Sequence, residues 1–163
     1  MGIKNPEPAK KKSDHAGVKF PPPLVFIGGM LAGLVYDSPW IHGQLADIVP
    51  SIFGGLMTII GIALMRHTVK SIKRAKTNIE PWLKTTTILT TDIYAHSRNP
   101  MYLGMAFIHG GIAIGGGSIA ALITLIISIV IIQVLVIAKE ERYLERQFGS
   151  EYLDYKKRTR RWI

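Results

Sequence analysis

The chain has 163 residues, with 20 Lys and Arg against 11 Asp and Glu, so its formal net charge is +9. Because 48% of its residues are hydrophobic, the composition excludes a disordered chain. The same apolarity argues against a nucleic-acid-binding protein, which the charge alone would suggest. The absence of cysteine excludes disulfides, thiolate metal sites and cysteine nucleophiles.

The charged and apolar residues are segregated along the chain. A Lys-rich polar segment at residues 1–20 is expected to be a disordered basic tail, and residues 21–163 a single membrane domain. Each apolar run that follows is close to the ~20 residues that a helix needs to cross a bilayer. We therefore predict an all-α integral membrane protein with four transmembrane helices, at about residues 24–40, 48–65, 101–117 and 118–138.

The basic residues predict the orientation of these helices. All 20 Lys and Arg lie in residues 1–20, 66–98 and 139–163, whereas the connections after the first and third spans contain none. Four alternating spans bring the basic segments to one side, and the positive-inside rule assigns that side to the cytoplasm. The loop 66–100, the C-terminal helices at 139–163 and both termini are therefore expected to be cytoplasmic, and a soluble helical core is disfavoured.

Small residues within the spans indicate how the helices pack. Gly29 and Gly33, and likewise Gly111 and Gly115, are four residues apart, a spacing that permits close helix approach. A ligand crevice at these glycines is the alternative, and packing is the favoured interpretation. The short turn at residues 116–118 predicts that spans three and four form an antiparallel hairpin.

The loop before the third span carries the first candidate site. Pro100 suits the first turn of a helix, so Arg98 and Asn99 are expected at a helix N-terminus, where exposed N–H groups favour an anion. Tyr102 and Gly104 follow within one turn. Tyr102 offers a hydroxyl group, and Gly104 leaves space because it has no side chain. The alternative is an interfacial anchor in which Arg98 reaches the headgroups and Asn99 caps the helix.

The cytoplasmic end of the fourth span carries the second candidate site. Glu140 and Glu141 are adjacent on a helix and point about 100° apart, so at least one is expected to face the bundle. The alternative is local pairing, in which Glu141 binds a neighbouring cation such as Arg142.

A short amphipathic helix is predicted at the C-terminus. Gly149 is expected to stop the preceding helix and Ser150 to serve as the new N-cap. The basic and aromatic end at residues 160–163 is typical of a membrane-surface anchor.

Three segments together resemble a known superfamily. They are Ser-Arg-Asn-Pro-Met-Tyr-Leu-Gly at 97–104, Glu-Glu at 140–141 and Phe-Gly-x-x-Tyr-x-x-Tyr-x-x-Arg at 148–158. Their order and spacing resemble the isoprenylcysteine carboxyl methyltransferase and phospholipid methyltransferase superfamily. The resemblance starts near Gly61, includes residues 76–81 and reaches Ile163, about two-thirds of the chain, and it is strongest to short bacterial members.

The resemblance implies an integral membrane enzyme that transfers a methyl group from S-adenosylmethionine. The acceptor would be a lipid-borne or hydrophobic carboxylate or amine at the cytosolic interface, in a bacterial inner membrane. The implied cofactor-binding residues are Arg98, Asn99, Pro100, Tyr102, Gly104, Glu140 and Glu141. The residues implied to close over the site are Tyr152, Tyr155 and Arg158.

Arg98, Asn99 and His96 are the candidate catalytic residues. An amine acceptor needs a general base, for which His96 is available, whereas a solvated loop histidine is the plainer interpretation. Methyl transfer from a sulfonium needs no metal, and none is expected. His109 lies inside the third span and is interpreted as a neutral packing residue.

One segment departs from the superfamily pattern. Members commonly have Gly-Pro-Tyr-Arg before the Arg-Asn-Pro motif, whereas this chain has Asp92-Ile93-Tyr94-Ala95. The departure leaves the geometry of this turn and the identity of the substrate open.

Two other function classes compete with the enzyme. A small four-helix transporter needs ionisable residues within its spans, and spans one, two and four have none apart from Asp37 near the end of the first. A non-catalytic adaptor would use the basic face to hold anionic membrane lipids, which are expected partners in either case. No nucleic-acid partner is expected, and the methyl acceptor and oligomeric state stay open.

Overall fold

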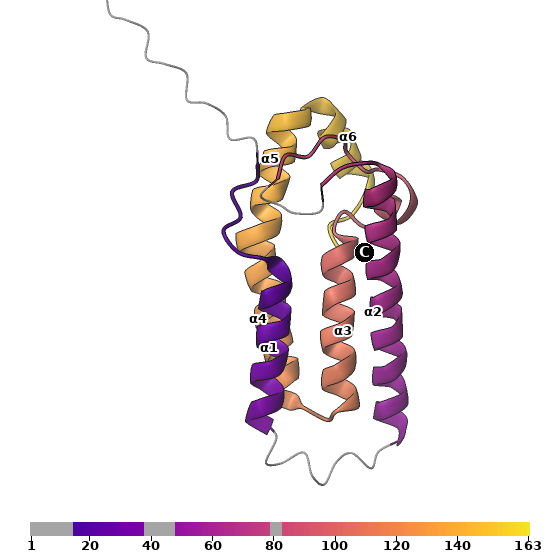
Figure 1. Cartoon of the computed structure of the whole chain (residues 1–163), viewed down its shortest axis with the longest axis vertical. Helices are drawn as coiled ribbons and strands as arrows, with labels where there is room; N and C mark the ends of the chain where they lie inside the picture. Colours follow the sequence, from indigo (N-terminus) through magenta and orange to yellow (C-terminus); the bar gives the residue numbers. More distant parts are fainter. Residues whose placement is uncertain (1–14, 38–47, 79–82) are drawn as a thin grey trace, which may run out of the picture.

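The computed structural model describes residues 15–37, 48–78 and 83–163, in which the regular elements are helices and no strand is present. Figure 1 shows the long helices α1 to α4 side by side, with α5 and α6 gathered at one end. In chain order the elements are α1 (Pro22–Asp37), α2 (Ile48–Arg74), the 3-10 helix η2 (Asp92–Ala95), α3 (Pro100–Gly115), α4 (Ile119–Ile132), the π-helix η3 (Gln133–Ile137), α5 (Ala138–Phe148) and α6 (Ser150–Arg158).

Some predictions lie outside the described residues. These are the first 14 residues of the basic tail, the connection at 38–47 with the predicted end of the first span, and part of the resembling segment at 79–82.

Within the described residues, two helices are long and apolar enough to cross a membrane. They are α2 and the continuous helix Ile119–Phe148, which comprises α4, η3 and α5, while α1 and α3 are apolar but shorter. Large apolar side chains are exposed along α1, α2 and α4, including Leu31, Ile52, Phe53, Ile59, Ile126 and Val130. The all-helical fold class is confirmed, and the count of four spans and its topology stay predictions.

The second helix is longer than its apolar run. The span predicted to end at residue 65 continues to Arg74, because residues 66–74 contain neither Gly nor Pro to interrupt the backbone hydrogen bonds. The helix therefore carries its apolar part directly into a basic end with Lys73 and Arg74 in the last turn.

Helices α2 and α3 approach each other at glycines. A Cβ atom added at Gly61 would lie 2.7 Å from the carbonyl oxygen of Gly104, and one at Gly111 would lie 2.6 Å from that of Gly54. Only glycine allows backbones this close. Gly115 leaves ordinary room for a Cβ, 3.7 Å from Gly54 Cα.

The other predicted glycine pair, Gly29 and Gly33, lies where α1 contacts α4. A Cβ at Gly33 would overlap the backbone of Ala121, and one at Gly29 would lie 2.6 Å from Ser128 Oγ. The packing interpretation of these glycines is confirmed, because neighbouring helices occupy the space that a ligand crevice would need.

The predicted antiparallel hairpin of α3 and α4 is present. Gly117 adopts a φ of 64° in the turn, and Ser118 caps α4 by accepting a hydrogen bond from the N–H of Ala121. Asp37 at the end of α1 accepts hydrogen bonds from Ser118 Oγ (2.7 Å) and the N–H of Ala120 (2.8 Å). This carboxylate stabilises the positive N-terminal end of α4.

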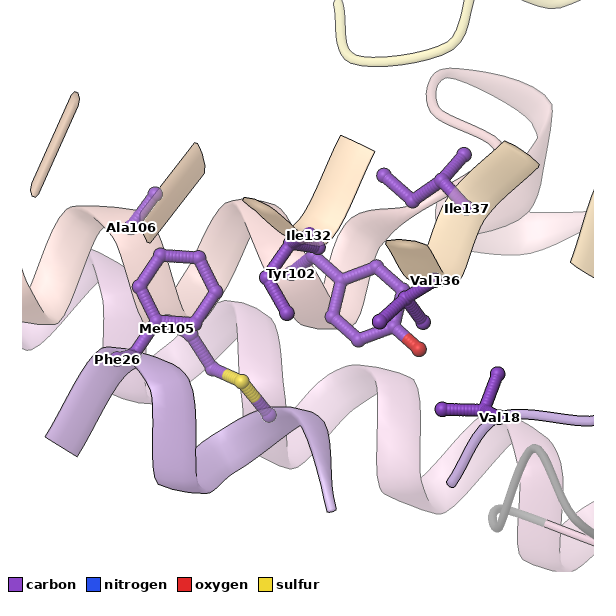
Figure 2. Packing of buried hydrophobic residues seen from close by; sticks show 8 residues of the cluster. All are labelled: Val18, Phe26, Tyr102, Met105, Ala106, Ile132, Val136 and Ile137. Carbon is purple, nitrogen blue, oxygen red and sulfur yellow. The ribbon is translucent and has the colours of Figure 1, made fainter. Parts of the chain in front are cut away.

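A cluster of buried side chains lies between the helical bundle and the end that carries α5 and α6. Figure 2 shows the Tyr102 ring among aliphatic side chains of the helix that follows, near Val136. The members of the cluster are Val18, Phe26, Tyr102, Met105, Ala106, Ile132, Val136 and Ile137. The cluster positions Tyr102 between the apolar bundle and the charged residues of α5.

The C-terminal segment differs from its prediction in two respects. Gly149, with a φ of 57°, is the N-cap of α6, and the predicted cap Ser150 is the first residue of the helix. Helix α6 ends at Arg158, so residues 159–163 are not helical, and they run back toward α3.

Candidate functional site

The short helix η2 begins with an aspartate in a left-handed conformation. Asp92 has a φ of 61°, a region that favours glycine. Its carboxylate accepts a hydrogen bond from Ser71 Oγ (2.8 Å) and lies 2.6 Å from His67 Nε2. These bonds lower the pKa of Asp92, with His67 contributing more than Ser71. The turn in which superfamily members commonly have glycine is therefore formed here by an aspartate fastened to α2.

Arg98 follows this turn and makes a buried ion pair. Its guanidinium lies 3.0 Å from Glu141 Oε1, and the two side chains are only 8% and 7% exposed. Removing one partner of such a pair leaves a buried charge and costs ~3–5 kcal/mol. The contact therefore fixes the loop before α3 against α5, and it excludes the interpretation of Arg98 as an interfacial anchor.

The non-helical C-terminal segment, residues 159–163, crosses this corner and is here called the strap. The N–H of Arg98 donates to the carbonyl of Arg160 (3.0 Å), and Asn99 Nδ2 donates to that of Arg161 (2.9 Å). Trp162 Nε1 donates to Oε1 of Gln133 in the π-helix (2.9 Å). Asn99 is thus the N-cap residue of α3 by position, but its side chain holds the strap and caps no N–H.

Glu141 binds a second arginine from the strap. Arg161 donates to both carboxylate oxygens, from Nε at 3.0 Å and from Nη2 at 2.7 Å. Hydrogen bonding to Glu141 is the main cause that raises the pKa of Arg161. Glu141 is therefore a structural centre joining the loop, α5 and the strap. The alternative of local pairing with Arg142 does not occur, since Arg142 Nε donates to the carbonyl of Ala138.

Glu140 is held differently from its neighbour. Its Oε1 accepts a hydrogen bond from the Tyr102 hydroxyl (2.8 Å), and its side chain lies just beyond the apolar part of the helix. Burial raises the pKa of Glu140 to about 7, and the nearby Glu141 adds to this effect, while the bond from Tyr102 opposes it. Glu140 therefore exchanges a proton near neutral pH.

These residues surround one cavity. The loop 83–89, the end of α2, the corner before α3, and helices α5 and α6 all contribute to its wall. Burial raises the pKa of Tyr94, Tyr152 and Tyr155, so their hydroxyls stay protonated as donors. The polar and aromatic lining residues are Thr77, Asn78, Thr85, Thr87, Tyr94, Arg98, Asn99, Tyr102, Glu140, Glu141, Tyr143, Tyr152 and Tyr155.

Most of the predicted site residues meet at this cavity. The lining includes Arg98, Asn99, Pro100, Tyr102, Glu140, Glu141, Tyr152 and Tyr155. Pro100 is the first residue of α3, as predicted.

Three predicted residues lie elsewhere. His96 is exposed at the end of η2. Gly104 faces α2, where an added Cβ would meet Met65 and the carbonyl of Gly61. The space left by its missing side chain is therefore filled by α2. Arg158 is exposed and donates from Nε to the carbonyl of Asp154 (3.3 Å). None of the three lines the cavity.

His109 lies in the bundle, away from this site. It is 1% exposed and makes an edge-to-face contact with Phe26, and its Nε2 lies 3.5 Å from Thr124 Oγ1. Its Nδ1 has no hydrogen-bond partner among the described residues. The contacts agree with a packing role.

Sequence reasoning missed Arg161 and the aromatic residues Tyr94 and Tyr143. Arg161 was assigned to a membrane-surface anchor, but it binds Glu141, and Trp162 binds Gln133 within the protein. The sequence did contain one signal. Two adjacent carboxylates, Glu140 and Glu141, stood against a single arginine in the corner, Arg98, which indicated that another cation was needed nearby.

The chain was also compared with known proteins. The family model described as phospholipid methyltransferase matches residues 49–151. An uncharacterized protein of Haemophilus influenzae is 41% identical over 63 residues, which make up 39% of this chain and all of that protein. No solved structure matches the chain.

Proposed function

Because the chain belongs to the phospholipid methyltransferase family, a family of membrane methyltransferases, we propose that it transfers a methyl group from S-adenosylmethionine to a lipid-borne or hydrophobic acceptor. The cavity between the corner before α3 and helices α5 and α6 is the proposed site. The observation that carries the proposal is the pairing of Arg98 with Glu141 beside the Tyr102–Glu140 hydrogen bond, at the basic end of an apolar bundle.

The cavity offers the groups that this cofactor requires. Arg98 Nε is buried without a hydrogen-bond partner among the described residues, and the Arg98 side chain lines the cavity. A guanidinium donor suits the carboxylate of the methionine part, and the Glu140 carboxyl suits ribose hydroxyls or an ammonium. The rings of Tyr152 and Tyr155 offer apolar surface for a purine. These residues fit the cofactor.

S-adenosylmethionine supplies, when bound, an electrophilic methyl group whose transfer needs no metal. The protein's own contribution is orientation, because holding reactants in line supplies much of the rate. Asn99 and Arg161 act as positioning residues: they fasten the strap across the corner and keep Glu141 away from solvent. Glu140, with its pKa near 7, is the cavity group suited to accept a proton when the acceptor is an amine.

The proposed site faces the cytoplasm. Support comes from the basic end of α2, which lies at the same end of the bundle as the basic helices α5 and α6, and from the positive-inside rule. A bacterial inner membrane with four crossings and both termini cytoplasmic is the proposed arrangement. A water-soluble cofactor and a lipid-borne acceptor meet most readily at this interface.

Calorimetry with S-adenosylhomocysteine tests the proposal. Full-length protein in lipid nanodiscs is expected to bind the nucleoside, and Glu140→Gln is expected to weaken binding about tenfold by removing one charge-assisted hydrogen bond. Glu151→Gln, an exposed carboxylate on α6, is the matched control and should bind as the wild type does. Absence of binding by the wild-type protein would exclude the proposed cofactor.

A further inference from the structure

The basic end of α2 presents exposed cations on one helix face. Arg66, Lys70, Lys73 and Arg74 follow the apolar part of the helix and are all exposed. Spacings of three and four residues bring them to the same side. None of the four forms an ion pair with a carboxylate in the described part of the chain.

These cations line a groove separate from the cofactor cavity. The groove runs along α2 to α3, and no residue lines both hollows. Toward the middle of the bundle its wall is apolar, formed by Ile62 and Ala63 of α2 and by Ile108 of α3. The groove is thus cationic at one end and apolar at the other, in the direction of the predicted bilayer.

The nearby carboxylate is already engaged. Asp92 accepts hydrogen bonds from His67 and Ser71, so it offers little to a further cation. A zwitterionic headgroup would bring an ammonium into a groove whose exposed charges are all positive. An anionic headgroup meets no such repulsion.

We propose that this groove binds an anionic phospholipid. Its phosphate would lie among Arg66, Lys70 and Lys73, and an acyl chain would follow Ile62 and Ile108 toward the bilayer centre. The apolar end favours a lipid over free phosphate, because a soluble anion would use only the cationic half. The proposal rests on the membrane placement given under the proposed function and is independent of methyl transfer.

Native mass spectrometry of the full-length protein in detergent tests the site. With added phosphatidylglycerol, the wild-type protein is expected to retain a bound lipid, whereas phosphatidylcholine is not retained. The Arg66→Gln/Lys70→Gln double variant should bind phosphatidylglycerol about 25-fold more weakly, at ~5-fold for each cation removed. The matched control Arg146→Gln/Lys157→Gln, which removes one Arg and one Lys on α5 and α6, should bind as the wild type does.

Three results would overturn the site: equal binding by the groove variant, equal retention of phosphatidylcholine, or displacement of the lipid by millimolar inorganic phosphate. S-adenosylhomocysteine binding by the groove variant should equal that of the wild type. A failure of nucleoside binding in the wild-type protein with lipid retention intact would therefore count against the proposed function alone.

Discussion

At the scale of single residues, two adjacent glutamates have different roles. Glu141 is enclosed by Arg98 and Arg161, and it holds the loop, α5 and the strap together. Glu140 lies at the cavity with the Tyr102 hydroxyl as its described hydrogen-bond donor and a pKa raised to about 7. Glu141 is thus held in ion pairs, whereas Glu140 lines the cavity with a carboxyl that no described cation pairs with.

The raised pKa of Glu140 predicts a pH dependence of stability. The ordinary value is 4.5, so between pH 4.5 and about 7 the unfolded chain releases this proton while the folded protein keeps it. Ionisation therefore destabilises the fold progressively as pH rises through this window. In thermal unfolding scans, Glu140→Gln should raise the melting temperature relative to the wild type at pH 8 and have little effect at pH 5. If the melting temperatures of the two proteins differed by the same amount at every pH, the pKa of Glu140 would not be raised by folding, and the prediction would be wrong.

Asp92 predicts a second residue-scale effect. Its left-handed backbone is strained for any residue but glycine, and its carboxylate compensates by binding His67 and Ser71. Asp92→Ala loses the bonds and keeps the strain, whereas Asp92→Gly loses the bonds and relieves the strain. Alanine should therefore be less stable than glycine by about 1 kcal/mol in urea unfolding. A glycine variant as unstable as the alanine variant would contradict the role of the backbone.

At the scale of helices, the contact between α2 and α3 depends on the absence of side chains. A Cβ at Gly61 collides with the Gly104 carbonyl, whereas a Cβ at Gly55 meets nothing within 4 Å. Gly61→Ala should thus lower stability by ~1–3 kcal/mol through overpacking, and Gly55→Ala on the same helix should not lower it. Thermal unfolding of the two variants side by side gives the comparison, and equal melting temperatures would refute the close contact.

The elements were predictable from the sequence to different degrees. The apolar runs predicted α2 and α4, and Pro100 predicted the start of α3, because these signals are local. The strap was missed, since a non-helical segment has no periodicity and Arg161 meets Glu141 across 20 residues of sequence. The sequence indicated the pairing of the helices only in part. Gly33 predicted a close approach of two helices, but it did not identify Ala121 as its neighbour.

The site illustrates the same limit. Arg98, Asn99 and the two glutamates were found because their order in the chain is characteristic, and the fold brings them to one cavity. His96 was selected as an available base in the loop and Arg158 by its position in the C-terminal motif, and both are exposed away from the cavity. Burial, which separates these cases, depends on tertiary contacts that a single sequence does not reveal.

At the scale of the whole molecule, the orientation in the membrane is the broadest prediction. The chain has no cysteine, so a single introduced thiol can be labelled specifically and shows on which side of the membrane that residue lies. Ser150→Cys at the start of α6 should react with an impermeant maleimide only after cells are opened. Ile119→Cys at the start of α4 should react in intact cells, provided that the outer membrane is permeable to the reagent. The reverse pattern would invert the topology and place the cavity outside.

The molecule joins an apolar bundle to a polar cavity at its basic end. The proposed methyl transfer to a membrane-borne acceptor is measured directly by incubating the purified protein, reconstituted with a bacterial lipid extract, with methyl-labelled S-adenosylmethionine. Label is expected in the organic phase with the wild-type protein, and the Arg98→Ala variant should reduce it at least tenfold. Label that stays entirely in the aqueous phase with a folded wild-type protein would contradict the claim.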